Sequence, residues 1–288
     1  MNKHAAFPPR LSCDCHVHVV GPKDRFPLPR ERRYTPMDAP AGALHDMLAR
    51  LGLERVVLVQ PSFYGTDNSC MLDCMAALAG SRGVAVLPAE MPGSELDALH
   101  KAGVRGLRVN IATGGTASVD QMRVDIAATA KLCARNGWHV QIFVPAGAIE
   151  PLMPLLLQLP VPTVIDHFGL IAPGPEGPAL RALLQLLHSG RIWVKISGAY
   201  RIADDPYDPR IDSLARRLCA VNPERIVWGS DWPHTPRHDL LRPALDEELP
   251  FQDIDTQGLL DLVPRWLEDD MLVRRVLVDN PAALYDFA

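Results

Sequence analysis

Apolar stretches and amphipathic stretches alternate along the whole chain. The apolar stretches are short and rich in β-branched residues, which is typical of strands buried on both faces of a parallel sheet. Eight of them are predicted as strands: Leu11–Val20, Arg55–Gln60, Val84–Leu87, Gly106–Ile111, Trp138–Val144, Thr163–His167, Ile192–Ile196 and Arg225–Gly229.

Amphipathic segments separate these predicted strands, with apolar residues at helical spacing. The predicted helices are Gly42–Leu51, a helix capped by Thr66 or Asp67 and ending at Leu78, Gly93–Ala102, Val119–Asn136, Gly147–Gln158, Pro178–Leu187, Ile211–Cys219, and further helices within Leu240–Ala288. Eight strand and helix units in 288 residues give about 36 residues per unit, the spacing of a (β/α)8 TIM barrel. We therefore expect an α/β fold with a single barrel domain over residues 1–288.

A doubly wound open sheet is the alternative fold. It would need a glycine-rich turn after the first strand, where the chain has Gly21-Pro22 instead. The 27 prolines fall at the ends of predicted elements and not in one linker, so no domain boundary is indicated.

The first predicted strand carries a His-x-His pair. Strict alternation places Asp14, His16 and His18 on one face and the cysteines Cys13 and Cys15 on the other. Both histidines precede a Gly-Pro break, so they lie at the carboxyl end of the strand. Ligands bind at that end in parallel α/β folds.

Two later strands end in residues of the same chemical kind. His167 ends the sixth predicted strand, and Asp231 follows the eighth. If the barrel closes, both converge with His16 and His18 at one mouth. Each residue alone has a structural explanation, as a packed histidine or a helix N-cap, but their joint position indicates an active site.

A long segment without helical or strand periodicity, Pro22–Pro40, follows the first strand. In a barrel it lies over the carboxyl-end face, where Tyr34 and the arginines could meet an anionic ligand. Those arginines are Arg25, Arg30, Arg32 and Arg33, and a solvated charged loop explains most of them.

Composition narrows the functional classes. The net charge of −5 has no long runs, so neither nucleic acid nor a membrane surface is an expected partner. No stretch has the length and apolarity of a membrane span, and Met1–Arg10 lacks a signal-peptide core, so we expect a cytoplasmic protein. The six cysteines are expected to be buried, reduced thiols.

Several stretches together resemble the amidohydrolase superfamily and, within it, the 2-pyrone-4,6-dicarboxylate lactonase group. The resemblance covers nearly the full chain. The matching stretches are Asp14-Cys-His-Val-His-Val-Val-Gly-Pro22, Val59-Gln-Pro-Ser-Phe-Tyr-Gly-Thr-Asp-Asn68, Gly106-Leu-Arg-Val-Asn110, Ile165-Asp-His167, Trp228-Gly-Ser-Asp-Trp-Pro-His234 and Asn280-Pro-Ala-Ala-Leu-Tyr285.

This resemblance implies hydrolysis of a carboxylated lactone, such as 2-pyrone-4,6-dicarboxylate or a related lactone of aromatic-compound catabolism. Asp231 would activate water, and His16, His18 and His167 would polarise the lactone carbonyl. The resemblance also implies substrate contacts: carboxylate clamps at Arg108 and Arg201 and neutral hydrogen bonds at Tyr34 and Ser62.

The sequence leaves the metal question open. A two-metal site is not expected, because the fourth strand offers Arg108 and Asn110 and the fifth ends at Phe143 and Val144, while His139 begins that strand at the wrong end. The lactonase resemblance implies a metal-free mechanism, so no cofactor is expected. If one divalent metal is present, Zn or Mn, its ligands are His16, His18, His167 and Asp231.

The chain also departs from the lactonase pattern. Arginines expected near Ala112–Ala117 and Phe168–Leu170 are missing, and Phe143 replaces a tyrosine. A lactone with one carboxylate, such as a muconolactone or a sugar-acid lactone, fits the remaining arginines equally well.

Two other functions and the oligomeric state stay open. One function is a metal-dependent decarboxylase of the aminocarboxymuconate semialdehyde decarboxylase type, and the other is a non-catalytic binding barrel. The small anionic lactone is the expected partner, with a homodimer left open.

Overall fold

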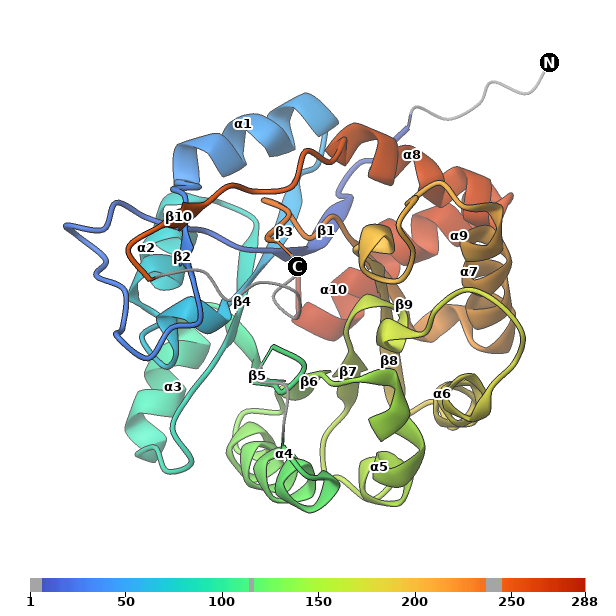
Figure 1. Cartoon of the computed structure of the whole chain (residues 1–288), viewed down its shortest axis with the longest axis horizontal. Coiled ribbons are helices and arrows are strands. Elements are labelled where there is room, and N and C mark those ends of the chain that lie inside the picture. Colours follow the sequence, from blue (N-terminus) through green and yellow to red (C-terminus); the bar gives the residue numbers. More distant parts are fainter. Residues whose placement is uncertain (1–6, 114–116, 237–244, 288) are drawn as a thin grey trace.

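The computed structural model describes residues 7–113, 117–236 and 245–287. Eight parallel strands form a nearly closed barrel with helices around it, which confirms the predicted fold class (Figure 1). The barrel strands are β1 (Cys13–Val17), β3 (Arg55–Val59), β4 (Ser81–Ala85), β5 (Val104–Asn110), β6 (His139–Phe143), β7 (Thr163–Ile165), β8 (Ile192–Ser197) and β9 (Ile226–Gly229).

Helices follow most of the barrel strands. They are α1 (Ala41–Leu51), α2 (Ser69–Ala77), α3 (Gly93–Lys101), α4 (Val119–Ala134), α5 (Ile149–Leu156), α6 (Pro178–His188), α7 (Pro209–Val221), α8 (Thr256–Leu267), α9 (Asp270–Arg274) and α10 (Asn280–Tyr285). Short 3-10 turns follow four of the strands at the carboxyl-end face: η1 (Ser62–Tyr64), η2 (Ala146–Ala148), η3 (His167–Leu170) and η4 (Ala199–Arg201). Part of the predicted helical region Leu240–Ala288, residues 240–244 and residue 288, lies outside the described residues.

The loop after β9 completes the barrel against β1. A parallel bridge joins Val17 to Trp232, and the backbone N–H of Asp231 donates to the carbonyl of His16 at 2.8 Å. The first and last strands are therefore hydrogen-bonded through the segment that carries Asp231, which ties this residue to the His-x-His strand.

The third barrel strand differs most from its predicted bounds. The third strand is Ser81–Ala85, not Val84–Leu87. Its first three residues, Ser81-Arg82-Gly83, are not apolar, so the apolar pattern placed the start of the strand too late. Pairing of Val56 with Ser81 and of Leu58 with Gly83 in β3 and β4 overrides the weak local preference.

Strict alternation in β1 proved wrong. Cys13 and Cys15 pack with residues from strands all round the barrel and with Tyr285, so they face its interior. A register shift between Asp14 and Val17 interrupts the alternation, and it allows His16 and His18 to face inward as well. The Asp14 carboxylate instead accepts backbone hydrogen bonds from His16 at 3.1 Å and Ser230 at 2.9 Å. All six cysteines are buried free thiols, as expected.

The segment after β1 is more ordered than predicted. Two of its residues form β2 (Thr35–Pro36), which pairs in parallel with β10 (Glu248–Leu249). This small ribbon anchors Tyr34 at the barrel mouth, whereas sequence periodicity gave no sign of it.

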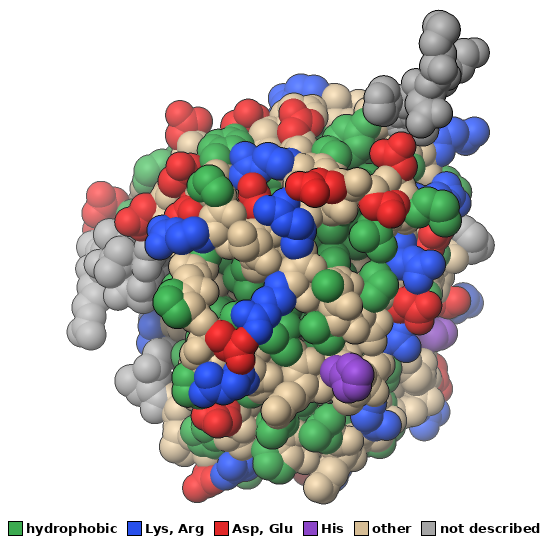
Figure 2. Space-filling view, turned by 90° about the vertical axis from the view of Figure 1, so that its right-hand side faces the viewer, with side chains coloured by type: hydrophobic (Ala, Val, Ile, Leu, Met, Phe, Trp, Pro, Cys, Tyr) green, Lys and Arg blue, Asp and Glu red, His purple; other side chains and the backbone are tan. Residues whose placement is uncertain are grey.

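Two surface observations bear on partners. No helix of the described residues is long and apolar enough to cross a membrane. On the face in Figure 2, acidic and basic side chains of the described residues are interspersed.

Candidate active site

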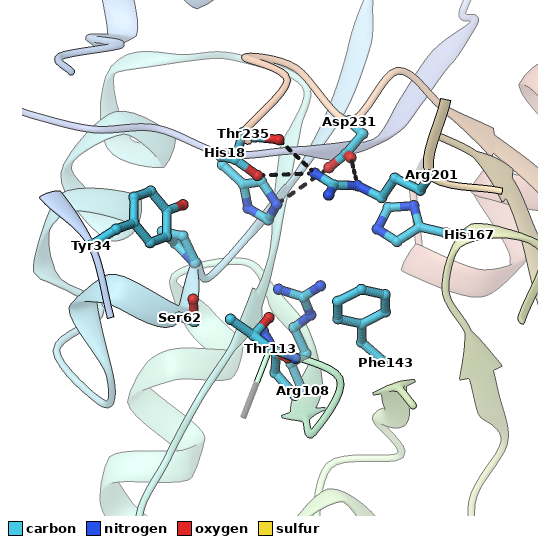
Figure 3. A pocket seen from close by; sticks show the side chains of 12 residues that line it. His18, Tyr34, Ser62, Arg108, Thr113, Phe143, His167, Arg201, Asp231 and Thr235 are labelled. Atoms are coloured by element: carbon cyan, nitrogen blue, oxygen red, sulfur yellow. Dashed lines mark hydrogen bonds and ion pairs between the residues drawn. The ribbon is translucent and has the colours of Figure 1, made fainter. Parts of the chain in front are cut away.

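A pocket opens at the carboxyl ends of the strands, and it contains all four predicted substrate contacts. Figure 3 shows Tyr34 and Ser62 on one side of it, Arg108 below, and Arg201 beside Asp231 and His167. Its lining consists of His18, Tyr34, Pro61, Ser62, Arg108, Asn110, Thr113, Phe143, His167, Arg201, Asp231 and Thr235.

Asp231 is fully buried and has two different carboxylate oxygens. Its Oδ2 accepts a hydrogen bond of 2.7 Å from the phenol of Tyr200 and an ion pair from Nε of Arg201. Its Oδ1 accepts no hydrogen bond from the residues that the structure describes. One oxygen is thus held in place while the other is free to contact a ligand.

Two imidazole nitrogens face this free oxygen. Nε2 of His18 lies 3.5 Å from Oδ1 of Asp231, and Nε2 of His16 lies 3.7 Å from it. Nδ1 of His18 is 2.7 Å from the carbonyl oxygen of Val59, which can only accept. Nδ1 of His18 therefore carries a proton, and in the neutral ring Nε2 is an acceptor.

His167 completes the predicted set of three histidines. Its ring centroid is 4.6 Å from that of His16, and Nδ1 lies 2.9 Å from the hydroxyl of Ser197. Phe143 packs edge-on against the ring at 5.2 Å. The structure thus brings together the four residues predicted from the ends of strands one, six and eight.

The backbone is strained where these groups leave the strands. His167 has φ of 49° and Asp231 has φ of 65°, the left-handed region that non-glycine residues rarely adopt. Gly198 has φ of 56°, and a Cβ there would lie 3.0 Å from Nδ1 of His167 and 3.2 Å from Oδ2 of Asp231. Only glycine fits between these two side chains.

A buried charged network lies beneath the histidines, and sequence reasoning did not predict it. Lys195 is fully buried, and its Nζ donates to the carbonyl of Cys15 at 2.8 Å and to Oε1 of Gln141 at 2.7 Å. Asp166 is buried beside it, with Oδ1 3.8 Å from that Nζ and 3.4 Å from Nδ1 of His16.

Arg108 belongs to the same network. Its Nε and Nη2 donate to Oδ2 of Asp166 at 3.3 and 3.1 Å, and Nη1 donates to the carbonyl of Gln60 at 3.3 Å. The guanidinium also lies 5.4 Å from the centre of the Phe143 ring. Arg108 is therefore held rigidly at the pocket wall by a buried carboxylate.

Arg201 joins Asp231 to the rim of the pocket. Besides its ion pair with Asp231, its Nη2 donates to the hydroxyl of Thr235 at 2.9 Å. Tyr34 packs edge-on against Phe63 at 5.6 Å, and Ser62 begins the turn η1. Both arginines predicted as clamps thus line the pocket while bound to carboxylates of the protein itself.

Burial and charge set the protonation states. Burial acts to raise the pKa of Asp231, but Arg201 and His167 more than offset it, so this pKa lies well below its ordinary value. Burial lowers the pKa of His167 to about 4 and that of His16 well below its ordinary value. Burial also lowers the pKa of Lys195 to about 8, against the attraction of Asp166. An ionised Asp231 beside neutral His16 and His167 is the expected state at neutral pH.

The residues present fit one divalent metal. Ligand atoms of His16, His167 and Asp231 lie within 4.8 Å of one another, all three buried. Among the described residues, Nε2 of His16 and Oδ1 of Asp231 have no hydrogen-bond partner, so both could coordinate an ion. His139 lies at the opposite end of the barrel, 5.3 Å from the ring of Tyr285, as its position at the start of β6 predicted.

Sequence signals existed for some of the missed residues. Asp166 and Tyr200 adjoin the predicted residues His167 and Arg201. Lys195 is the one charged residue in the predicted strand Ile192–Ile196, a position where burial demands partners. The expected positions around Ala112–Ala117 fall partly outside the described residues, since 114–116 are not described.

Curated proteins similar in sequence span almost the whole chain. A 4-sulfomuconolactone hydrolase from Hydrogenophaga intermedia is 34% identical over 282 residues, 96% of this chain and 89% of that protein. A 2-pyrone-4,6-dicarboxylate hydrolase from Comamonas testosteroni is 32% identical, covering 96% of this chain and 90% of its own. A D-galactarolactone isomerase from Agrobacterium fabrum is 29% identical and covers 96% and 91%.

Solved structures and a family model also match nearly the whole chain. A 2-pyrone-4,6-dicarboxylic acid hydrolase described as putative, from Pseudomonas putida, has a TM-score of 0.79 at 28% identity, covering 96% of this chain and 98% of its own. An amidohydrolase from Burkholderia multivorans with bound zinc has a TM-score of 0.73 at 19% identity, covering 96% and 100%, and shares the fold. The amidohydrolase family model matches residues 13–287. The chain belongs to the amidohydrolase family.

Proposed function

We propose that this protein hydrolyses a carboxylated lactone, with 2-pyrone-4,6-dicarboxylate and muconolactone-type rings as the leading substrates. The observation that carries the proposal is the free Oδ1 of Asp231, which lies between Nε2 of His16 and Nε2 of His18. The relatives named as lactone hydrolases support the same reaction class.

Asp231 and His18 form the acceptor side of this arrangement. Oδ1 of Asp231 accepts hydrogen bonds, as does Nε2 of His18 in the neutral ring, so a water molecule in contact with both atoms would donate one proton to each. Its lone pair then points away from both, toward the substrate. As the water attacks, Asp231 takes its proton and acts as general base.

The donor side must stabilise the oxygen of the lactone carbonyl as it gains negative charge. N–H groups of His16 and His167 are the proposed donors, held in a buried site where such hydrogen bonds are strong. Collapse of the tetrahedral intermediate breaks the ring C–O bond, and the proton held by Asp231 can pass to the leaving oxygen.

The arginines provide recognition of the acid group. Arg108 and Arg201 are proposed to bind a substrate carboxylate, with Tyr34 and Ser62 donating neutral hydrogen bonds at the pocket rim. Since each arginine already contacts an aspartate, its position is fixed before substrate arrives, which lowers the entropy cost of binding.

A divalent metal is compatible with the same residues. His16, His167 and Asp231, whose ligand atoms lie within 4.8 Å of one another, would hold it, whereas the fourth predicted ligand, His18, is not part of this cluster. A bound metal would supply Lewis-acid polarisation of the carbonyl and of water.

A metal-dependent decarboxylase has less support. The curated relatives named above are lactone hydrolases and a lactone isomerase, whereas a manganese-bound 5-carboxyvanillate decarboxylase from Novosphingobium aromaticivorans shares only the fold, at 11% identity. Cytoplasmic location, a homodimer and the single domain over residues 1–288 stay predictions.

The deciding experiment is a panel of lactones offered to the purified protein before and after exhaustive chelation. Release of acid from carboxylated lactones, and none from neutral analogues, is the expected result. Carbon dioxide release from carboxylated aromatic compounds without lactone hydrolysis would contradict the proposal.

A further inference from the structure

Nδ1 of His16 lies between two groups that require opposite protonation of the ring. Nζ of Lys195 and Oδ1 of Asp166 are each 3.4 Å from it. An ammonium can only donate, so it pairs with an unprotonated Nδ1, whereas a carboxylate can only accept, so it pairs with a protonated one. Which neighbour is the partner therefore decides which nitrogen of the neutral ring carries the proton.

The contacts favour Lys195 as this partner. Its Nζ has three N–H groups, and the carbonyl of Cys15 and Oε1 of Gln141 take two of them. The third remains for Nδ1 of His16, a contact with hydrogen-bond geometry. Oδ1 of Asp166, at the same distance, accepts no hydrogen bond from any residue that the structure describes.

The second carboxylate oxygen of Asp166, Oδ2, accepts hydrogen bonds from other residues. It accepts from Arg108 and from Nε2 of Gln141 at 3.1 Å, and these bonds fix the carboxylate. Asp166 thus provides negative charge near the Lys195 ammonium, while Lys195 makes the directional bond to His16.

We propose that Lys195 is a positioning residue that holds neutral His16 with its proton on Nε2, so that this N–H donates to the reacting carbonyl. The inference rests on the proposed lactone hydrolysis. It assigns opposite roles to the two histidines of the His-x-His pair: Nε2 of His16 donates, and Nε2 of His18 accepts. The bond from Nδ1 of His18 to Val59 and the bond from Lys195 to His16 produce this difference.

The same bond has a consequence for metal ions. A metal would need the lone pair of Nε2 of His16, which requires the proton on Nδ1, toward Asp166. Lys195 opposes that tautomer. Removing its ammonium should therefore weaken hydrolysis and strengthen binding of zinc to the metal-free protein.

The test uses ¹⁵N-histidine-labelled protein and long-range ¹H–¹⁵N spectra, with the His16 signals assigned by a His16→Gln variant. In the wild type, we expect the proton on Nε2 of His16. In Lys195→Met, we expect it on Nδ1, with kcat at least about tenfold lower, KM within about twofold, and zinc binding roughly tenfold tighter by calorimetry.

Gln141→Met is the matched control, since it removes a buried partner of both Lys195 and Asp166 but leaves the ammonium. It should retain the proton on Nε2 of His16. A proton on Nδ1 in the wild type would overturn the inference, and this measurement does not depend on any variant folding. An unchanged tautomer in folded Lys195→Met would overturn it as well.

Failure of the proposed function gives a different result. A protein that hydrolyses no lactone but shows the tautomer change in Lys195→Met contradicts the reaction while supporting the control of His16 by Lys195. Lactone hydrolysis with Nδ1 of His16 protonated in the wild type contradicts the inference alone.

Discussion

The phenol of Tyr200 donates a hydrogen bond of 2.7 Å to Oδ2 of Asp231. Tyr200 comes from the turn after β8, and Asp231 from the segment after β9. Together with Arg201, this bond occupies one carboxylate oxygen and directs the other toward His16 and His18. The division of the carboxylate into a held oxygen and a free oxygen underlies the predictions that follow.

Replacing the proposed base should lower turnover by orders of magnitude. Asp231→Asn has the same size and keeps an oxygen that accepts from Tyr200, but its amide cannot take a proton from water. We expect kcat to fall by about 10²-fold or more, with the fold retained by circular dichroism. Asp46→Asn, an exposed position on α1, is the control. Normal turnover in Asp231→Asn would contradict the role of the base.

Removing the phenol should affect the same carboxylate indirectly. A hydrogen bond to an ionised carboxylate favours its charged form, so loss of the bond in Tyr200→Phe raises the pKa of Asp231. The acidic limb of the kcat profile should move to higher pH, and kcat should fall about tenfold. Tyr207→Phe, at a more exposed tyrosine, should leave the profile unchanged. If kcat falls but the acidic limb of its pH profile stays at the same pH, the role of Tyr200 is purely structural.

Loss of the Arg108 side chain should weaken substrate binding without slowing the chemical step. Arg108→Met is expected to raise KM for carboxylated lactones about tenfold or more and to change kcat by no more than about twofold. It also leaves buried Asp166 without its guanidinium, so unfolding in urea should show a loss of about 3 kcal/mol. An unchanged KM for the carboxylated substrate would remove Arg108 from the recognition site.

Acid should destabilise the protein through a histidine far from the pocket. Burial lowers the pKa of His139 to about 3, and neither ring nitrogen has a hydrogen-bond partner among the described residues. Its folded pKa lies below the unfolded value near 6.5, so its contribution to stability is complete above about pH 6.5 and is lost as the pH falls toward 3. His139→Leu should flatten the decline in unfolding free energy between pH 6.5 and 4. An equal decline in the variant would point to other groups.

Metal removal tests whether the proposed lactone hydrolysis depends on a metal ion. We expect hydrolysis to persist after exhaustive chelation, because Asp231 and the histidines supply a base and hydrogen-bond donors of their own. Metal content by mass spectrometry must accompany the assay. Activity lost on chelation and restored by one equivalent of Zn²⁺ or Mn²⁺ would assign a metal-dependent reaction.

Local sequence patterns determined the barrel and the ends of its strands. Burial of a strand leaves an apolar run in the local sequence. Such runs predicted eight strands and placed His16, His18, His167 and Asp231 at the carboxyl-end mouth of the barrel. The motifs around these four residues also identified the family to which the chain belongs.

Tertiary structure decided the partners of those residues. The inward direction of Cys13 and Cys15 depends on a register shift, and the β2–β10 ribbon pairs segments about 200 residues apart. The Lys195, Asp166 and Gln141 network joins β8, β6 and the residue that follows β7, and the bond from Tyr200 to Asp231 joins two loops. Hydrogen bonds and ion pairs between distant segments depend on distances that only the folded chain fixes, which is why sequence alone predicted the reacting groups but not what orients them.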